Sequence, residues 1–329
     1  MTAARLLQQR LPDGTRRVIL AEDAAHVVTG VATTRELAQA AIAESVSLLD
    51  AARARRSDDS VDLVAALEAG ELLPAIDHPD SARLMLAGTG LTHLGSAAGR
   101  DAMHKAAAEG KQTDSMRLFL EGMEGGRPAA GVIGAQPEWF YKGDGQGLVA
   151  PEAPFASPAF AQDGGEEPEL AGIYLIGDDG TPFRLGIALA NEFSDHVTER
   201  HNYLWLAHSK LRQASLGPEL LLGEPPADIR GTSRIVRDGK TLWEKPFLTG
   251  EANMSHSLAN LEHHHFKYAA FRRPGDIHVH FFGTATLSCA DGVQTQDGDV
   301  FEIEAAPFTL PLRNALATAP ADTVTVKPL

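Results

Sequence analysis

Two glutamates separated by a single residue stand directly before an apolar run. Glu167 and Glu169 precede residues 170–176, which the sequence predicts as a strand. Because residues i and i+2 of a strand point to the same face, the two carboxylates are expected to project together. Converging carboxylates repel each other unless a cation or a proton neutralises them, and hard oxygen ligands suit Mg²⁺, Mn²⁺ or Ca²⁺. The alternative is an acidic surface loop, which the spacing alone favours.

A second polar cluster follows the next predicted strand, residues 183–191. Polar residues gathered just after an apolar run are expected where a strand end opens into a site. Glu192 or Asp195 could complete the carboxylate set. The alternative is the start of a helix, with Asn191 or Ser194 as its N-cap.

Two further positions offer groups that could act on an acidic substrate. Lys210 is a lone cation; most such lysines are solvated, but one held near a metal and acids could have its pKa lowered and serve as a base. Gly283 and Thr284 follow a predicted strand at residues 277–282 and offer N–H groups and a hydroxyl to a carboxylate. The alternative for this pair is an ordinary β-turn.

Histidines occur in two groups that resemble metal motifs, at His263 to His265 and at His278 and His280. A His-rich zinc site is one interpretation. Three successive histidines point in different directions, however, and the His-Glu-x-x-His spacing is absent from the sequence. Packing or surface roles are therefore favoured for most of them.

Composition narrows the class of protein. The 329 residues include 44 acidic and 29 basic side chains, for a formal charge of −15, which disfavours nucleic acid and anionic membranes as partners. The lone cysteine, Cys289, excludes an intrachain disulfide and a thiolate cage, and we expect a buried structural thiol. Neither a signal peptide nor a membrane-spanning apolar run is recognisable, so we expect a cytoplasmic protein.

The first part of the chain alternates strands and helices. Residues 17–28 are predicted as two strands joined by a turn, and Thr33 with Glu36 forms a capping box that starts a helix reaching about residue 56. A short helix capped by Asp59 or Ser60 is expected through residue 67. We further predict a strand at residues 83–87 and a helix at residues 97–110.

The second part of the chain has a different sequence pattern, with short predicted strands between turns that contain Gly, Pro and Asp. The loop-rich residues 125–134 separate the two parts, and we place an N-terminal α/β domain at residues 1–130 and a second domain at residues 131–329. The α+β fold class follows from a mostly antiparallel β core with some helix. The predicted strands lie at residues 139–142, 170–176, 183–191, 232–237, 241–247, 277–282 and 300–304.

The order of these motifs resembles that of the fumarylacetoacetate hydrolase superfamily over residues 85 to 316, and more closely that of its sugar-acid dehydratases. The family's motifs match Glu167-Pro168-Glu169-Leu170, Asn191-Glu192-Phe193-Ser194, Lys210, Arg273-Pro274-Gly275-Asp276 with Gly283-Thr284, and Gly298-Asp299-Val300-Phe301-Glu302-Ile303. The resemblance implies a C-terminal mixed β-sandwich roll after a smaller N-terminal domain. It also implies a homodimer or larger homo-oligomer.

The resemblance assigns a divalent cation, Mg²⁺ or else Mn²⁺ or Ca²⁺, to Glu167, Glu169 and Glu192. The third ligand is usually Asp in the family, and Glu192 reaches one methylene further. The resemblance implies that Gly283 and Thr284 bind the substrate carboxylate.

The same resemblance bears on the type of reaction. In hydrolases of the superfamily, a His in the region of a Gly-x-Asn-Tyr-x-x-His segment activates water. An acidic residue shortly after this His assists it. Residues 88–93 lack the Asn-Tyr pair, and residues 94–100 contain no acid, although His93 is expected to line the site. The dehydratases instead carry a Glu on the entering strand together with the lysine, and Glu138 and Lys210 match those positions.

The implied function is therefore metal-dependent dehydration of a 2-keto-3-deoxy-pentonate, in which Glu138 and Lys210 share the roles of base and acid. One alternative is hydrolysis of a C–C bond in a 2,4-diketo acid, with the same metal and with water activated near His93. A second is a non-catalytic sugar-acid binding protein. In each case the expected partner is a small 2-keto acid or sugar acid.

Overall fold

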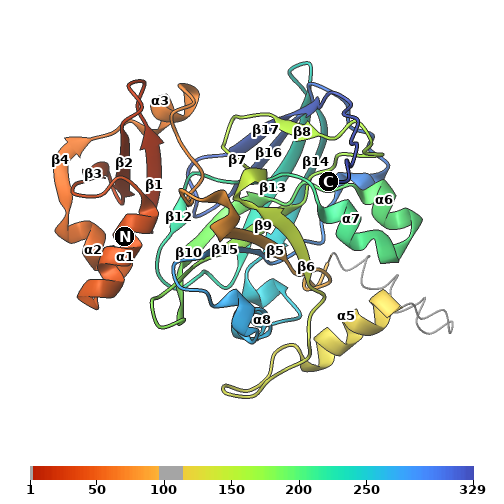
Figure 1. Ribbon diagram of the computed structural model, residues 1–329, viewed down its shortest axis with the longest axis horizontal. Helices are drawn as coiled ribbons and strands as arrows, with labels where there is room; N and C mark the ends of the chain where they lie inside the picture. Colours follow the sequence, from red (N-terminus) through yellow and green to blue (C-terminus); the bar gives the residue numbers. More distant parts are fainter. Residues whose placement is uncertain (1–2, 96–113) are drawn as a thin grey trace.

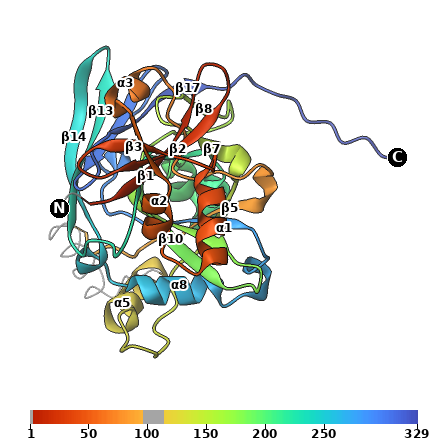
Figure 2. The same cartoon turned by 90° about the vertical axis from the view of Figure 1, so that its left-hand side faces the viewer.

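The computed structural model describes residues 3–95 and 114–329, and it is built on two β-sheets (Figure 1). Within this part of the chain, no helix is long and apolar enough to cross a membrane. Figure 2 shows the residues after the last strand running away from the body of the molecule.

The larger sheet follows the order β4-β3-β2-β1-β12-β10-β9-β15-β5-β6, with β11 on β10 and β7 on β11. Most of its pairs are antiparallel, whereas β15 with β5 and β11 with β7 are parallel. Its strands are β1 (Arg5–Arg10), β2 (Arg16–Ala21), β3 (Ala25–Val28), β4 (Arg56–Ser60), β5 (Leu84–Gly88), β6 (Phe140–Asp144), β7 (Leu148–Val149), β9 (Pro168–Ile176), β10 (Pro182–Asn191), β11 (Ala214–Leu216), β12 (Leu220–Leu221) and β15 (Ile277–Phe281).

The smaller sheet packs against one face of the larger one. Its order is β14-β13-β16-β17-β8, from β8 (Phe155–Ser157), β13 (Ile229–Arg237), β14 (Lys240–Thr249), β16 (Val300–Ala305) and β17 (Leu312–Thr318). Leu170 and Leu189 of the larger sheet share one apolar core with Phe247 and Ile303 of the smaller. The alternate residues of β9, such as Ile173, face the opposite side, where they join the core under α1 and α2.

The helices lie around the edges and outer faces of the sheets (Figure 1). They are α1 (Thr34–Glu44), α2 (Leu48–Ala54), α3 (Leu63–Glu68), α5 (Asp114–Gly125), α6 (His196–His201), α7 (Leu206–Lys210) and α8 (Leu258–Phe266). Figure 1 shows α6 and α7 side by side, on the side of the molecule away from the N-terminal strands.

The single helix predicted from residue 33 to about residue 56 is wrong, because the chain forms two helices there. The capping box is present: Thr33 accepts from the N–H of Glu36 and caps α1. Ser45 then adopts a left-handed backbone with φ of 54°, which ends α1, and Ser47 caps α2. The next predicted cap is also wrong, since residues 56–60 form β4 and Asp62 caps α3.

The predicted α+β fold class is confirmed, and each predicted strand of the second part is present within a few residues. The helix predicted at residues 97–110 lies outside the described residues. The division at residue 130 stays a prediction. β5, which precedes residue 130, is hydrogen-bonded to β15, which follows it, so the large sheet spans both predicted domains.

Candidate active site

The register of β9 and β10 brings three glutamates to one face of the larger sheet. Glu169 stands opposite Ala190, and the backbone N–H of Glu192 donates to the carbonyl of Glu167 at 3.1 Å, which extends the pairing by one step. Residues directly opposite each other on antiparallel strands share a face. The three side chains of Glu167, Glu169 and Glu192 are all buried and bring one oxygen each within 4.8 Å of one another.

The charges of this cluster fit a hard divalent cation. Burial and the nearby Glu192 and Glu167 raise the pKa of Glu169 well above its usual range. Burial and Glu167 likewise raise the pKa of Glu192. Three buried oxygen donors that repel one another are the ligand set that Mg²⁺ or Mn²⁺ neutralises. The residues therefore fit the metal that the sequence predicts.

Separate donors hold these carboxylates in place. The N–H of Gly283 donates to Glu169 Oε2 at 2.7 Å. The Nζ of Lys142, which is fully buried, lies 2.8 Å from Glu192 Oε1 and also donates to the carbonyl of Phe193 at 2.6 Å. Buried charges are stable only when they are paired and hydrogen-bonded, as this lysine is.

Lys210, at the end of α7, contacts two of the three glutamates. Its Nζ donates to Glu167 Oε1 and, at 2.9 Å, to Glu192 Oε2. Burial alone would lower the pKa of Lys210, but Glu167 and Glu192 raise it well above its usual value. In the protein without a metal the carboxylates therefore stabilise the ammonium, and the lowered lysine pKa expected beside a metal stays a prediction.

Glu138 faces the same cavity, which has a volume of about 450 Å³ and is also lined by Glu167, Glu169, Glu192 and Lys210. A Cβ atom placed on Gly90 would lie 1.7 Å from Glu138 Oε2. The carboxylate therefore lies directly against the backbone of the turn after β5, where a side chain would displace it.

Two expected site residues are placed elsewhere. His93 does not line the cavity: it is buried, with Nε2 3.0 Å from Thr249 Oγ1 and Nδ1 3.1 Å from Thr92 Oγ1, and burial lowers its pKa to about 4. Asp195 is not an alternative third ligand, because it caps α6 and pairs with Arg212 at 2.9 Å. Both side chains are occupied by structural contacts.

The turn at Gly283 and Thr284 does line the cavity, but part of its hydrogen-bonding capacity is already used. The Gly283 N–H positions Glu169, and its φ of +93° suits glycine. A Cβ atom there would lie 2.5 Å from Thr92 Oγ1. The Gly283 N–H is thus committed to a glutamate, and Thr284 stays a candidate for the substrate.

Sequence reasoning missed three residues of this site. Lys142 holds Glu192, Glu199 lies 4.0 Å from Lys210, and His196 Nε2 lies 3.0 Å from Glu167 Oε1. Burial raises the pKa of Glu199. A signal was present only for Lys142, which lies two residues after Phe140 on a predicted strand and so shares the face of that apolar side chain.

The histidines form a packed cluster. His265 Nε2 lies 2.9 Å from His278 Nδ1, and the ring centres of His265 and His280 are 4.7 Å apart. In the described chain, no group of three or more potential ligands includes them. The packing role favoured from the sequence agrees with this arrangement.

Comparison with protein-family models gives no match, and neither does comparison with curated protein sequences. Comparison with solved structures gives matches over nearly the whole chain. A structure of 2-keto-3-deoxyarabinonate dehydratase has a TM-score of 0.70 and 17% identity, over 97% of this chain and 100% of that one.

Two more solved structures extend this likeness. A 2-keto-3-deoxy-D-arabinonate dehydratase complexed with magnesium and 2,5-dioxopentanoate has a TM-score of 0.68 and 17% identity, over 97% of this chain and 99% of that one. A 5-carboxymethyl-2-hydroxymuconate delta-isomerase from Mycobacterium smegmatis has a TM-score of 0.56 and 17% identity, over 96% and 99%. The chain therefore has the fold of the fumarylacetoacetate hydrolase superfamily, as its sequence motifs imply.

Proposed function

We propose that this protein is a metal-dependent dehydratase that removes water from a 2-keto-3-deoxy sugar acid such as a 2-keto-3-deoxy-pentonate. One observation carries the proposal: Glu138 and Lys210 line the same cavity as Glu167, Glu169 and Glu192. Metal chelation alone requires neither the extra acid nor the lysine. A solved structure of the same fold, of 2-keto-3-deoxy-D-arabinonate dehydratase, holds magnesium and 2,5-dioxopentanoate.

The three glutamates would hold the cation, and the cavity would admit a small, open-chain acid. When bound there, a divalent cation supplies Lewis-acid polarisation of a 2-keto acid, which makes the C3–H bond more acidic. The cavity is lined on its apolar side by residues that include Leu91, Phe140 and Leu206. These side chains limit the water around the reacting carbons, which strengthens electrostatic interactions within the site.

Proton transfer falls to the two remaining groups. The carboxylate of Glu138 is the proposed base for a C3 proton, because it is positioned against Gly90 rather than in the glutamate cluster. The ammonium of Lys210 is the proposed proton donor to the departing C4 hydroxyl, which leaves as water. The C3–H electron pair forms the C3=C4 bond as the C4–O bond breaks.

The product of this elimination is an unsaturated 2-keto acid with a hydroxyl at C5. Loss of the C5 and O5 protons and gain of protons at C3 and C4 converts a pentonate product into 2,5-dioxopentanoate without further oxidation or reduction. The overall reaction is thus the loss of one water.

The carbon–carbon hydrolase is the weaker alternative. It needs a base for water, and the expected His93 is not among the residues that line the cavity and instead contacts Thr92 and Thr249. Because this fold is shared with an isomerase, isomerisation is a further outcome to test.

The test is product analysis after incubation with Mg²⁺ and a panel of D- and L-2-keto-3-deoxy-pentonates and 2,4-diketo acids. The proposal expects one product, lighter than the pentonate by one water. Two smaller acids from a diketo acid would identify a hydrolase, and a product of unchanged mass an isomerase. Binding of the pentonates without turnover would identify a binding protein.

A further inference from the structure

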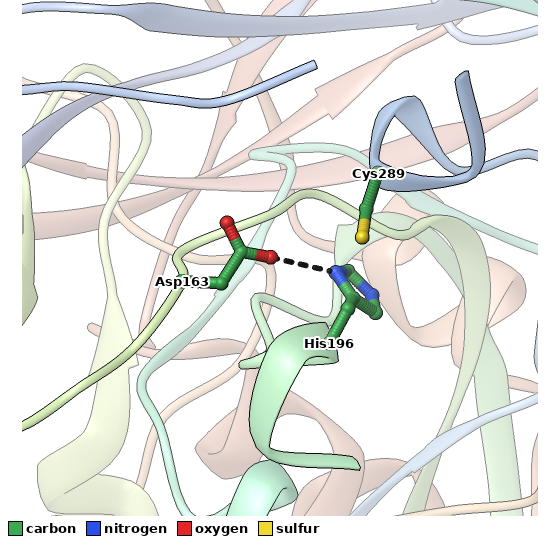
Figure 3. Close-up of side chains that lie close together, drawn as sticks. All are labelled: Asp163, His196 and Cys289. Atoms are coloured by element: carbon green, nitrogen blue, oxygen red, sulfur yellow. Dashed lines mark ion pairs between the residues drawn. The ribbon is translucent and has the colours of Figure 1, made fainter. Parts of the chain in front are cut away.

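A second group of side chains that could bind a metal lies next to Glu167, outside the glutamate cluster. It consists of Asp163 before β9, His196 at the start of α6, and Cys289 in the 3₁₀ turn Ser288–Asp291 (Figure 3). One potential ligand atom of each lies within 4.8 Å of the others. Figure 3 shows the carboxylate and the sulfur converging on the same edge of the imidazole.

The ring of His196 has one nitrogen with a hydrogen bond and one without. Nε2 lies 3.0 Å from Glu167 Oε1, whereas Nδ1 has no hydrogen-bond partner and lies 3.5 Å from Asp163 Oδ2, which has none either. Both atoms are shielded from solvent, and the His196 side chain is only 7% exposed. Buried polar atoms without partners are costly, so a positive charge, either a proton or a metal ion, is expected between them.

The hydrogen bond at Nε2 determines what Nδ1 can do. Because Glu167 accepts, Nε2 carries a proton, and a metal ion at this place would replace the proton on Nδ1 and take its lone pair. Figure 3 shows Nδ1 facing the carboxylate of Asp163, with the sulfur of Cys289 on the same side of the ring. A histidine that donates to a carboxylate through one nitrogen and offers the other is the usual form of a metal-ligating histidine.

We propose that Asp163, His196 and Cys289 bind a second divalent cation of borderline-soft character, of which Zn²⁺ is the type. One oxygen, one nitrogen and one sulfur make a ligand set that suits zinc rather than magnesium. The three ligands leave a fourth position open. Asp163 and Cys289 also line a separate cavity of about 490 Å³, which provides a path from solvent.

Arg200 contacts the proposed sulfur ligand. Its Nη2 donates to Cys289 Sγ at 3.1 Å. The two sites therefore differ in their donors: three carboxylates in one, and mixed oxygen, nitrogen and sulfur in the other.

The second ion would tie together three segments and orient Glu167 through His196. The glutamate site would then be positioned in part by an ion that takes no part in proton transfer. This inference concerns metal binding alone, so it does not depend on the proposed dehydration.

The experiment titrates reduced, metal-free protein with Co²⁺ as a spectroscopic substitute for Zn²⁺, in the presence of excess Mg²⁺. A thiolate-to-cobalt charge-transfer band that saturates at one equivalent and is abolished by added Zn²⁺ is expected. The Cys289→Ser variant should lose the band, and Asp163→Ala should weaken cobalt binding by about 10-fold or more. Glu169→Gln should keep the band, because it changes only the other site.

Absence of the band in the unmodified protein would overturn the proposal, and would mean that a proton occupies the gap between His196 and Asp163. A band that retains its intensity and affinity in Asp163→Ala would also overturn it. Circular dichroism of each variant checks that the chain is folded. Because the signal needs no substrate, its loss is distinguishable from a failure of the proposed dehydration.

Discussion

The carboxylates of Glu167, Glu169 and Glu192 repel one another, and a different donor holds each. The N–H of Gly283 holds Glu169, Lys142 holds Glu192, and Lys210 contacts both Glu167 and Glu192. The site without its metal is therefore preorganised by cations and an amide, and the metal is expected to complete the neutralisation.

Glu169→Gln tests the role of the glutamate that pairs with neither Lys142 nor Lys210. The amide keeps the size of the side chain but removes the charge that a hard cation needs, so activity should fall about 100-fold or more. The dependence on Mg²⁺ should disappear with it. Activity at several Mg²⁺ concentrations measures both effects, and a fully active variant contradicts the metal assignment.

Lys142→Met tests whether the buried lysine positions Glu192. Methionine fills a similar volume without the charge, and Glu192 would lose its contact at 2.8 Å. The apparent affinity for Mg²⁺ should fall about 10- to 100-fold. The exposed Lys267→Met serves as the matched control. Equal Mg²⁺ affinities for the two variants would show that Lys142 only fills space.

Gly90→Ala tests the position of Glu138. The added methyl group would lie 1.7 Å from Glu138 Oε2, so the carboxylate must move and kcat should fall about 10-fold or more. Gly147→Ala is the control, because its Cβ atom would meet only Leu86 at 3.8 Å. Unchanged kcat in Gly90→Ala would argue against Glu138 as the base.

At the residue scale, the sequence contained enough to predict the glutamate cluster but not what holds it. The two-residue period of a strand puts Glu167 and Glu169 on one face, but the spacing alone favoured a surface loop and left Glu192 and Asp195 as alternatives. The resemblance to a known family assigned Glu167, Glu169 and Glu192 together. The ammonium form of Lys210 and the role of Lys142 depend on distances between segments that a strand period does not give.

At the element scale, the contact of α8 with β15 buries three histidines. Burial lowers the pKa of His280 to about 3 and that of His278 to about 4, against an ordinary value of 6.5, and it also lowers the pKa of His265. The rings are therefore neutral in the folded protein at neutral pH.

Proton binding by these histidines is linked to folding, and this linkage determines whether the stability of the protein rises or falls with pH. Below pH 6.5 the unfolded chain takes up protons on these histidines while the folded protein does not, so stability falls as the pH drops from about 6.5 to about 4. Denaturant unfolding across this range measures the slope of the free energy of unfolding against pH. His280→Gln should reduce it, and His208→Gln, which changes an exposed histidine, should not. Equal slopes in all three proteins would contradict the account.

Elements with a strong local signal were predicted and elements fixed by distant contacts were not. The hairpin of β2 and β3 and the strands β9 and β10 follow from turns and apolar runs. The break between α1 and α2 was missed because the left-handed residue that ends α1 is Ser45, whereas glycine is the residue that usually marks such a position. β12 was missed because two residues are too few for a pattern.

At the scale of the whole molecule, the N-terminal strands extend the sheet that carries the site. β1 pairs with β12, and β12 pairs with β10, which Glu192 directly follows. The sequence predicted the α+β class, but this continuity depends on pairings more than 200 residues apart in sequence, as for Arg5 with Leu221. The expected homodimer or larger assembly stays a prediction.

The three-glutamate site is proposed to carry out a metal-dependent dehydration. The most direct measurement is the product mass formed from 2-keto-3-deoxy-pentonates by chelator-treated protein, before and after Mg²⁺ is restored. We expect no product without the metal and, once Mg²⁺ is restored, one product lighter than the substrate by a single water. The same product formed at an undiminished rate by the chelated protein, or no loss of water from any isomer with Mg²⁺ present, would contradict it.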